Sequence, residues 1–296
     1  MRRSRWRKGW KVSRNCWVVQ VEREVIRVED LWFRYPGSDS WALRGVNLRV
    51  SQGEVIAFIG QNGGGKTTLA KNLNGLLKPT RGRVLVEGLD TRTTPTHELV
   101  KRVGYVFQNP THQIFESSVW REVAYGPRNL GLPPDEVERR VRWALSEVGL
   151  SGYEDHNPYD LDYGKMKLLT IASVLAMKPN VLVLDEPTTG QDHAGRRTLA
   201  SLVRKLHGEG FTIIIITHDM KFVSENAGRT VLIANGQVVL DGPTRSVLQA
   251  VEVLKENAIK PPQIVQLSLE LQRRGFKLDA LTLQEAVEQV KKILRG

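Results

Sequence analysis

Hydrophobic and polar positions follow two different periods along the chain from about residue 25. Six short apolar runs have the length and composition of β-strands: VIRVEDLWFRY (25–35), LRGVNLRV (43–50), EVIAFIG (54–60), VGYVF (103–107), VLVLD (181–185) and TIIIIT (212–217). The last four are apolar at almost every position, as in strands that are buried on both faces of a sheet. The pattern predicts an α/β fold with a parallel core and with the first two runs in a separate edge sheet.

The segment between VGYVF and VLVLD has almost no strand pattern. In PPDEVERRVRWALSEVGL (133–150), apolar residues recur at helical spacing after two prolines and an aspartate, which is a common helix start. We therefore expect a helical subdomain at about 111–178, inserted into the sheet. Later in the chain, VLIANGQVVLDG (231–242) predicts a hairpin that turns at Asn235 and Gly236.

From about residue 245 the chain has the pattern of a helical extension. Pro261, Pro262 and Gly275 interrupt it, and Thr282 and Glu285 have the spacing of a capping box that begins a last helix. The sequence thus predicts three parts. These are a basic N-terminal extension (1–24), a domain that includes the helical insertion (25–245), and a helical C-terminal extension (246–296).

Composition excludes several classes of protein. The chain has 296 residues, 41% of them hydrophobic, which suffices for a substantial core, and its single cysteine, Cys16, cannot form an internal disulfide. No apolar run approaches the roughly 20 residues that cross a bilayer. No apolar segment of about 7–15 residues follows the basic N-terminus, so a secretory signal is not expected either. We expect the protein to stay inside the cell.

The net charge of +11 is concentrated at the N-terminus. Residues 1–20 contain seven lysines and arginines and no acidic residue, which leaves +4 for the rest of the chain. With Trp6, Trp10 and Trp17 among these cations, the segment is suited to phosphates or anionic lipid headgroups. A disordered tail and a translation start placed too far upstream are the alternatives. Because the body of the chain is only mildly basic, nucleic acid is not an expected partner.

The strand EVIAFIG leads directly into GQNGGGKT (60–67), which has the spacing and the strand-to-helix context of a phosphate-binding P-loop. Glycines let backbone N–H groups curve around phosphate oxygens, and the N-terminus of the next helix favours negative charge. Lys66 is expected to reach the β- and γ-phosphates, and the Thr67 hydroxyl to bind Mg²⁺. The predicted nucleotide-binding residues of this region are Gly60, Gln61, Asn62, Gly63, Gly64, Gly65, Lys66, Thr67 and Thr68.

Polar residues follow three further strands. Asp185 and Glu186 end the VLVLD run, Gln108 follows VGYVF, and His218 comes shortly after TIIIIT. A carboxylate at Asp185 suits Mg²⁺ bound through water, and Glu186 suits a group that orients or deprotonates an attacking water. Taken alone, Gln108 and His218 carry no specific meaning, and only their order relative to the P-loop makes them informative.

In this order and spacing, the motifs resemble those of an ATP-binding cassette (ABC) ATPase over about residues 25–245. The resemblance implies a P-loop NTPase core with an antiparallel β subdomain and an inserted helical subdomain, and ATP and Mg²⁺ as cofactors. It also implies roles for particular residues: Glu186, His218 and Gln108 in hydrolysis; Thr67, Gln108 and Asp185 at the metal; and Tyr35, Asp162, Gly164 and Asp192 at nucleotide, Tyr35 by stacking on adenine. An ordinary strand aromatic is the alternative for Tyr35.

A narrower resemblance is carried by VGYVFQNPTHQIF, VAYGPRNLGL, VLAMKP and PPQIVQLSLELQRRG, which are similar to segments of energy-coupling-factor (ECF) transporter ATPases. It implies the motor subunit of an importer for vitamins or transition-metal ions, on the cytoplasmic side of the cell membrane. A second ATPase would pair head-to-tail with this chain, beneath an integral-membrane coupling protein and a substrate-binding membrane subunit. A groove near residues 109–125 would receive the coupling helices, and the tail would help the ATPases pair. Surface packing without a partner is the alternative for both.

The segment LDYGK (161–165) stands where the family pattern has Leu-Ser-Gly-Gly-Gln, the signature that faces the γ-phosphate bound to the other chain. Tyr163 replaces a glycine whose backbone approaches phosphate closely, and Asp162 adds a negative charge at a helix start. If Asp162 faced the phosphate, repulsion of about 4 kcal/mol at roughly 4 Å would outweigh the roughly 0.3–1 kcal/mol that a helix N-terminus offers an anion. The alternative is that Asp162 caps the helix and Lys165 offsets its charge. Either arrangement predicts a poor trigger of hydrolysis, and Gln191, where the family usually has leucine, is a further departure.

We therefore expect an ATP-hydrolysing subunit of an asymmetric heterodimer. Its own P-loop, Asp185, Glu186 and His218 would form a competent site with a partner's intact signature, while LDYGK serves a weaker one. A homodimer is the alternative. Two other functions stay open, namely a nucleotide-dependent structural subunit that hardly hydrolyses ATP and a soluble ABC protein that acts on nucleic acid. Another polypeptide chooses the transported solute, so no residue here identifies it.

Overall fold

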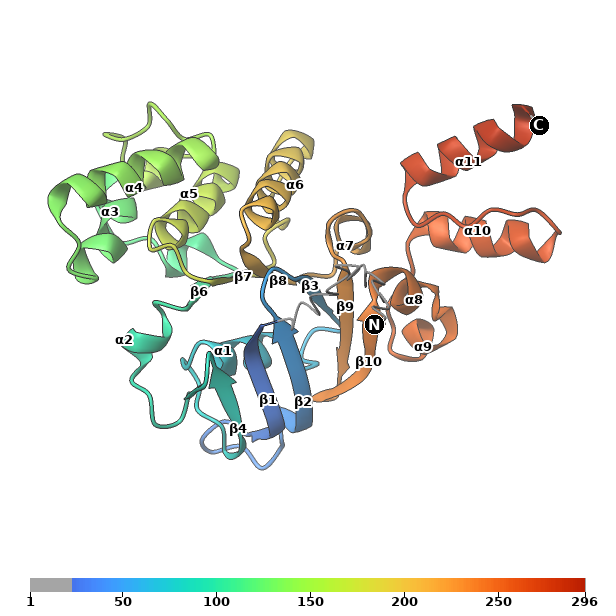
Figure 1. The fold of residues 1–296 in the computed structure, drawn as a ribbon, viewed down its shortest axis with the longest axis horizontal. Helices are drawn as coiled ribbons and strands as arrows, with labels where there is room; N and C mark the ends of the chain where they lie inside the picture. Colours follow the sequence, from blue (N-terminus) through green and yellow to red (C-terminus); the bar gives the residue numbers. More distant parts are fainter. Residues whose placement is uncertain (1–22, 296) are drawn as a thin grey trace, which may run out of the picture.

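Two β-sheets form the centre of the molecule in the computed structural model, which describes residues 23–295 (Figure 1). The four-stranded sheet has the order β2-β1-β4-β5, and the six-stranded sheet has the order β10-β9-β3-β8-β7-β6. The strands are β1 (Glu24–Phe33), β2 (Leu43–Ser51), β3 (Val55–Ile59), β4 (Arg81–Val86), β5 (Leu89–Asp90), β6 (Val103–Val106), β7 (Val181–Asp185), β8 (Thr212–Ile216), β9 (Arg229–Ala234) and β10 (Gln237–Pro243). The smaller sheet is antiparallel, and the larger one is parallel except for its β9–β10 pair, so the predicted parallel core and edge sheet are confirmed.

The register of the larger sheet brings the ends of three strands together. Phe58 on β3 pairs with Ile216 on β8, which in turn pairs with Asp185 on β7. All residues of these three strands are buried, as expected for strands covered on both faces. Because parallel strands end at the same edge of a sheet, the P-loop after β3 lies beside the segments that follow β7 and β8.

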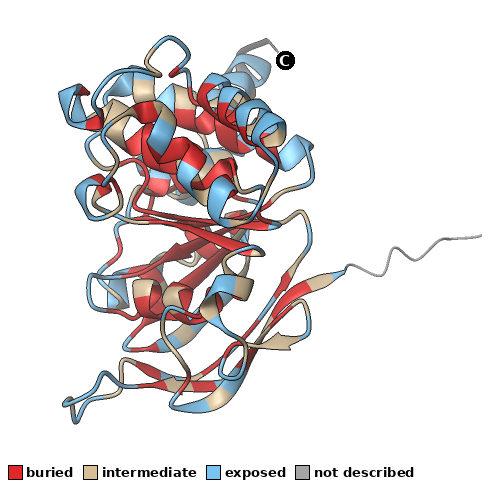
Figure 2. Ribbon diagram, turned by 90° about the vertical axis from the view of Figure 1, so that its left-hand side faces the viewer, coloured by how far each residue is buried: buried red, intermediate tan, exposed pale blue. Residues whose placement is uncertain are grey.

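Helices cover both faces of this sheet and lie beside its two edges. They are α1 (Lys66–Leu73), α2 (Thr96–Leu99), α3 (Val119–Asn129), α4 (Pro134–Glu147), α5 (Tyr163–Leu175), α6 (His193–Gly208), α7 (Met220–Asn226), α8 (Thr244–Gln249), α9 (Val251–Glu256), α10 (Gln263–Arg273) and α11 (Leu283–Arg295). Helices α3 to α5 lie beside the β6 edge, and α8 to α11 lie beside the opposite, β10 edge (Figure 1). Buried residues run through the strands and the inner faces of the helices (Figure 2), and they form two large hydrophobic clusters to which alternate residues of β3 contribute.

The structure differs from the sequence prediction in several local features. Strands β4 and β5 were not predicted. The first half of β4 contains Arg81, Gly82 and Arg83, so its apolar run is short, and β5 has only two residues. Helix α1 begins within the P-loop motif, at Lys66, and ends at Leu73; Gly75, with a φ of 76°, follows its end. The predicted hairpin is confirmed, with φ of 50° at Asn235 and 76° at Gly236.

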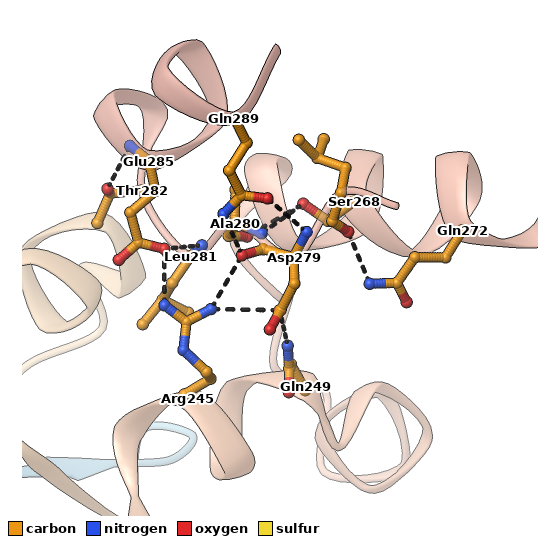
Figure 3. Close-up of polar contacts among 11 residues, drawn as sticks. Arg245, Gln249, Ser268, Gln272, Asp279, Ala280, Leu281, Thr282, Glu285 and Gln289 are labelled. Atoms are coloured by element: carbon orange, nitrogen blue, oxygen red, sulfur yellow. Dashed lines mark hydrogen bonds and ion pairs between the residues drawn. The ribbon is translucent and has the colours of Figure 1, made fainter. Parts of the chain in front are cut away.

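The C-terminal helices are held to the rest of the molecule by a polar network (Figure 3). Arg245 on α8 donates to the Glu285 carboxylate at 2.7 Å and to the Asp279 carboxylate at 3.2 Å. The predicted capping box forms only in part, since the Thr282 hydroxyl accepts from the Glu285 N–H but the Glu285 carboxylate accepts from the Leu281 N–H. The three-part division of the chain stays a prediction, and most of its basic N-terminal part lies outside the described residues. Within residues 23–295, no helix has the length and hydropathy needed to cross a bilayer.

Candidate nucleotide-binding and hydrolysis site

The loop at 60–67 fits against the backbone of the β9–β10 hairpin. A Cβ atom on Gly60 would lie 2.0 Å from the Ile233 carbonyl oxygen, and one on Gly64 would lie 3.0 Å from the same oxygen. The N–H of Gly236, at the hairpin turn, donates to the Gly64 carbonyl at 3.0 Å. A side chain at Gly60 would therefore displace the loop, which explains why this close approach requires glycine.

Lys66 closes the loop from inside. It is 6% exposed, and its Nζ donates to the carbonyls of Gly60 at 2.7 Å and Gln61 at 2.8 Å. Burial lowers the pKa of Lys66, while the nearby Glu186 and Asp185 carboxylates act in the opposite direction. A phosphate oxygen is a stronger acceptor for this ammonium group than either carbonyl, so the side chain is placed to transfer its hydrogen bonds to a nucleotide.

Asp185, at the end of β7, lies next to the first turn of α1. Its Oδ2 accepts hydrogen bonds from the Thr67 hydroxyl at 3.1 Å and from the Tyr105 hydroxyl at 2.6 Å. Its Oδ1 is buried and has no hydrogen-bond partner among the described residues. Burial, followed by the Asp185 charge, raises the pKa of Tyr105, so this phenol remains a donor. A free carboxylate oxygen next to a hydroxyl is a donor set that fits Mg²⁺, a hard cation that takes few protein ligands and keeps water or phosphate oxygens as the rest.

Glu186 is fixed by the segment that follows β8. The Thr217 hydroxyl donates to Glu186 Oε2 at 3.2 Å, and His218 Nδ1 lies 2.9 Å from the same oxygen. The Glu186 side chain is 8% exposed, and its backbone has a φ of 47°, uncommon for a residue other than glycine. The backbone and both contacts thus hold the carboxylate in one orientation at the edge of the P-loop.

A pocket of about 470 Å³ is lined by Lys66, Thr67, Asp185 and Glu186, and its wall also includes Tyr35, Asn62 and Gln108. The predicted residues Gly60, Gln61 and His218 do not line it. The ring of Tyr35 is 43% exposed, and its hydroxyl lies 3.0 Å from the Thr68 hydroxyl. Gln61 points elsewhere, since its side-chain amide donates to the Asn257 carbonyl at the end of α9. The structure therefore brings most of the predicted P-loop, metal and hydrolysis residues into one pocket.

A second pocket of about 510 Å³ is lined by three more of the predicted residues, Asp162, Gly164 and Asp192. Asp162 caps α5, because its Oδ1 accepts from the Lys165 N–H at 2.9 Å and its Oδ2 pairs with the Lys165 ammonium at 2.7 Å. These hydrogen bonds, led by the one from the Lys165 side chain, lower the pKa of Asp162. The capping arrangement foreseen as one of two alternatives is the one that the structure contains. Contact of these residues with nucleotide across a dimer stays a prediction.

Lys167 is a residue that sequence reasoning missed. It lies on α5, is fully buried, and its Nζ contacts three backbone carbonyls, those of Phe107, Gln108 and Asp185. One side chain thus connects α5, which begins within LDYGK, to the Gln108 loop and to the end of β7. A lysine inside the apolar run of α5 was the available signal, because a buried ammonium group requires partners.

Lys167 should make the stability of the protein depend on pH. Burial lowers its pKa to about 8 from 10.5, so between these values the unfolded chain binds more protons and stability rises with pH. We expect wild type to gain roughly 3 kcal/mol relative to Lys167→Met between about pH 8 and 10.5. Urea unfolding of both proteins across this range measures the difference, and a difference that does not change with pH would contradict the assignment.

Comparison with known proteins identifies the family. A family model described as ABC transporter matches residues 43–189. The chain is 42% identical over 271 residues to the energy-coupling factor transporter ATP-binding protein EcfA1 of Caldanaerobacter subterraneus, a match that covers 89% of this chain and 98% of the relative. The chain belongs to the ABC transporter ATP-binding proteins. This ABC ATPase is also 39% identical to EcfA of Methanothermobacter thermautotrophicus, over 92% of this chain and 88% of the relative.

A solved structure supports the same assignment. CbiO1 from Clostridium perfringens, described as part of the ABC transporter complex cbiONQ, has a TM-score of 0.72 and 37% identity, covering 84% of this chain and 100% of the other. The predicted ABC ATPase fold, ATP hydrolysis as the activity, and the resemblance to ECF transporter ATPases are thus confirmed. The roles of individual residues stay predictions. No group of three or more His, Cys, Asp or Glu side chains in residues 23–295 is arranged to hold a metal ion.

Proposed function

We propose that this ABC ATPase hydrolyses Mg·ATP to drive an ECF-type importer of a vitamin or a transition-metal ion. It would work as a peripheral subunit on the cytoplasmic side of the membrane. The observation that carries the proposal is the Glu186 carboxylate, held by Thr217 and His218 at the edge of the P-loop pocket. A merely structural nucleotide-binding subunit has no use for a carboxylate fixed in this way.

The residues of the pocket divide the chemistry among them. Thr67, Gln108 and Asp185 would hold Mg²⁺, which when bound neutralises charge on the phosphate oxygens. Glu186 uses Oε2 for its contacts with Thr217 and His218. Its other oxygen is therefore available to orient the attacking water and accept its proton, and Lys66 would donate to the phosphates.

A groove on the helical side of the molecule fits the predicted coupling site. It has a volume of about 460 Å³ and is lined by apolar and aromatic side chains, among them Phe107, Phe115 and Tyr125. Phe115 is 60% exposed and packs edge-to-face on Tyr125 with ring centres 4.6 Å apart. The buried carboxylate of Glu122 accepts from the N–H groups of Phe115 and Glu116, so the segment that carries Phe115 is fixed in place. A rigid, exposed aromatic pair beside a groove is suited to a helix of a membrane partner.

The coupling site can be tested by membrane association in the native host. Tyr125→Asp places a charge in the groove and should release most of the protein from the membrane fraction, where wild type should sediment. Leu76→Asp is the matched control. Leu76 is 43% exposed, nearly the same as Tyr125 at 44%, but Leu76 does not line the groove. Thermal unfolding establishes that both variants are folded. Wild type found only in the supernatant, or equal behaviour of the two variants, would refute the proposed coupling.

A second ATPase is part of the proposal. Helix α11 carries an exposed apolar stripe formed by Leu283, Val287, Val290 and Ile293. The spacing of four, three and three residues places them on one face of the helix, as at a helix–helix contact. Pairing through this tail, and the preference for a heterodimer over a homodimer, stay predictions.

A further inference from the structure

Two of the departures from the family's motifs lie in the same place in the structure. The ring of Tyr163, from LDYGK, packs on the backbone of Gly190, where an added Cβ would lie 2.5 Å from two ring carbons. Gln191, where the family usually has leucine, donates from Nε2 to the Gly164 carbonyl at 3.0 Å. The two side chains point in opposite directions across the same boundary, one from α5 to the 186–192 loop and one from that loop to α5.

Glycines make room for both side chains. Gly190 has a φ of 75°, and a Cβ on Gly195, at the start of α6, would lie only 1.9 Å from Gln191 Oε1. A residue larger than glycine at either position would push Tyr163 or Gln191 out of its contact. The close fit shows that the surrounding backbone accommodates the large residues at 163 and 191, and that these residues connect the start of α5 to the 186–192 loop.

The connection ends at residues of the hydrolysis site. The loop that carries Gly190 and Gln191 begins at Glu186 and ends at Asp192, which caps α6 by accepting from the Gly195 N–H at 2.7 Å. Tyr163 and Gln191 also line the pocket that contains Asp162, Gly164 and Asp192. The phenol ring and the amide therefore share with the backbone of LDYGK the pocket that a phosphate of a second chain would have to enter.

We propose that Tyr163 and Gln191 form a latch within one chain, and that this latch must open before LDYGK can close on a nucleotide held by a second chain. The proposal rests on the dimeric function proposed above. Breaking the latch costs free energy each time LDYGK closes on a nucleotide, whereas the P-loop of the same chain is not affected. This chain would therefore pair best with an ATPase whose own signature segment is not held by such a latch. In that pair, this chain supplies the P-loop, Glu186 and His218 to the competent site.

Hydrogen exchange of the full chain without nucleotide tests the latch itself. In Tyr163→Ala and in Gln191→Met, amides of residues 186–195 should exchange about tenfold faster than in wild type, because a side-chain contact or hydrogen bond that holds this loop is lost. Tyr163→Phe keeps the ring and is the matched control, which should exchange as wild type does. Unchanged exchange in both Tyr163→Ala and Gln191→Met would show that no latch exists.

Dimerisation tests what the latch does. In a Glu186→Gln background with Mg²⁺ and ATP, the concentration at which half of the chains pair should fall about tenfold when Tyr163→Ala and Gln191→Met are added, as measured by sedimentation. Unchanged pairing would overturn the gating role. Nucleotide binding is measured separately with a fluorescent ATP analogue. Failure of Glu186→Gln to bind the analogue would refute the proposed function, whereas the exchange result does not depend on nucleotide.

Discussion

Glu186→Gln should lower the rate of ATP hydrolysis by about 10²–10⁴-fold while leaving ATP binding nearly unchanged. The amide has the same shape as the carboxylate and can still accept from the Thr217 hydroxyl, so the 186–192 loop should keep its position. What the amide lacks is the basicity needed to take a proton from water. Phosphate release under saturating Mg·ATP measures the rate, and titration with a fluorescent ATP analogue measures binding.

The matched control for this change is Glu209→Gln. Glu209 lies at the exposed end of α6 and the substitution removes the same charge, but it does not line the P-loop pocket. Hydrolysis by Glu209→Gln should equal that of wild type. A Glu186→Gln variant with full activity would remove Glu186 from the role of base, because hydrolysis would then proceed without this carboxylate.

Lys66→Met should weaken ATP binding by about 10- to 100-fold and abolish measurable hydrolysis at ordinary ATP concentrations. The expected loss is that of a charge-assisted hydrogen bond, roughly 1.5–3 kcal/mol. Methionine retains most of the buried volume of the lysine side chain, which is 6% exposed, so the loop should not collapse. Fluorescent-nucleotide titration gives the affinity directly.

Lys71→Met provides the comparison, because Lys71 lies on the same helix, outside the loop and outside the pocket wall. This variant should bind ATP as wild type does. If both variants lost affinity equally, the effect would come from net charge or from helix α1. If neither did, Lys66 would serve only to hold the Gly60 and Gln61 carbonyls, its contacts without nucleotide.

The sequence was most informative for residues that stand at the end of a predicted strand or directly after it. The P-loop, Asp185, Glu186 and His218 each follow a buried strand, and the parallel register brings the strand ends together. Apolar periodicity predicts these strands, so the convergence of the residues after them could be expected in advance. The hairpin turn at Asn235 and Gly236 was predictable for a similar reason, since the turn type demands those residues.

Contacts between side chains and distant backbone could not be predicted in this way. Lys167 lies on a largely apolar helix, and its three carbonyl acceptors come from the segment after β6 and from the end of β7. The packing of Tyr163 on Gly190 likewise depends on where the 186–192 loop lies relative to α5. Sequence spacing identified LDYGK as unusual. Only the structure shows that Tyr163 packs on Gly190 and that Gln191, in the same loop as Gly190, donates a hydrogen bond back to Gly164.

Helices α3 to α5 and helices α8 to α11 lie at opposite edges of the six-stranded sheet (Figure 1). The buried strands β3, β7 and β8 lie between these surfaces, so a substitution at one surface does not touch the other. If the groove beside α3 binds the membrane partner and α11 contributes to pairing, as proposed above, the two partners can change independently over evolution. One ATPase gene could then be recruited to several importers without altering the subunit with which it pairs.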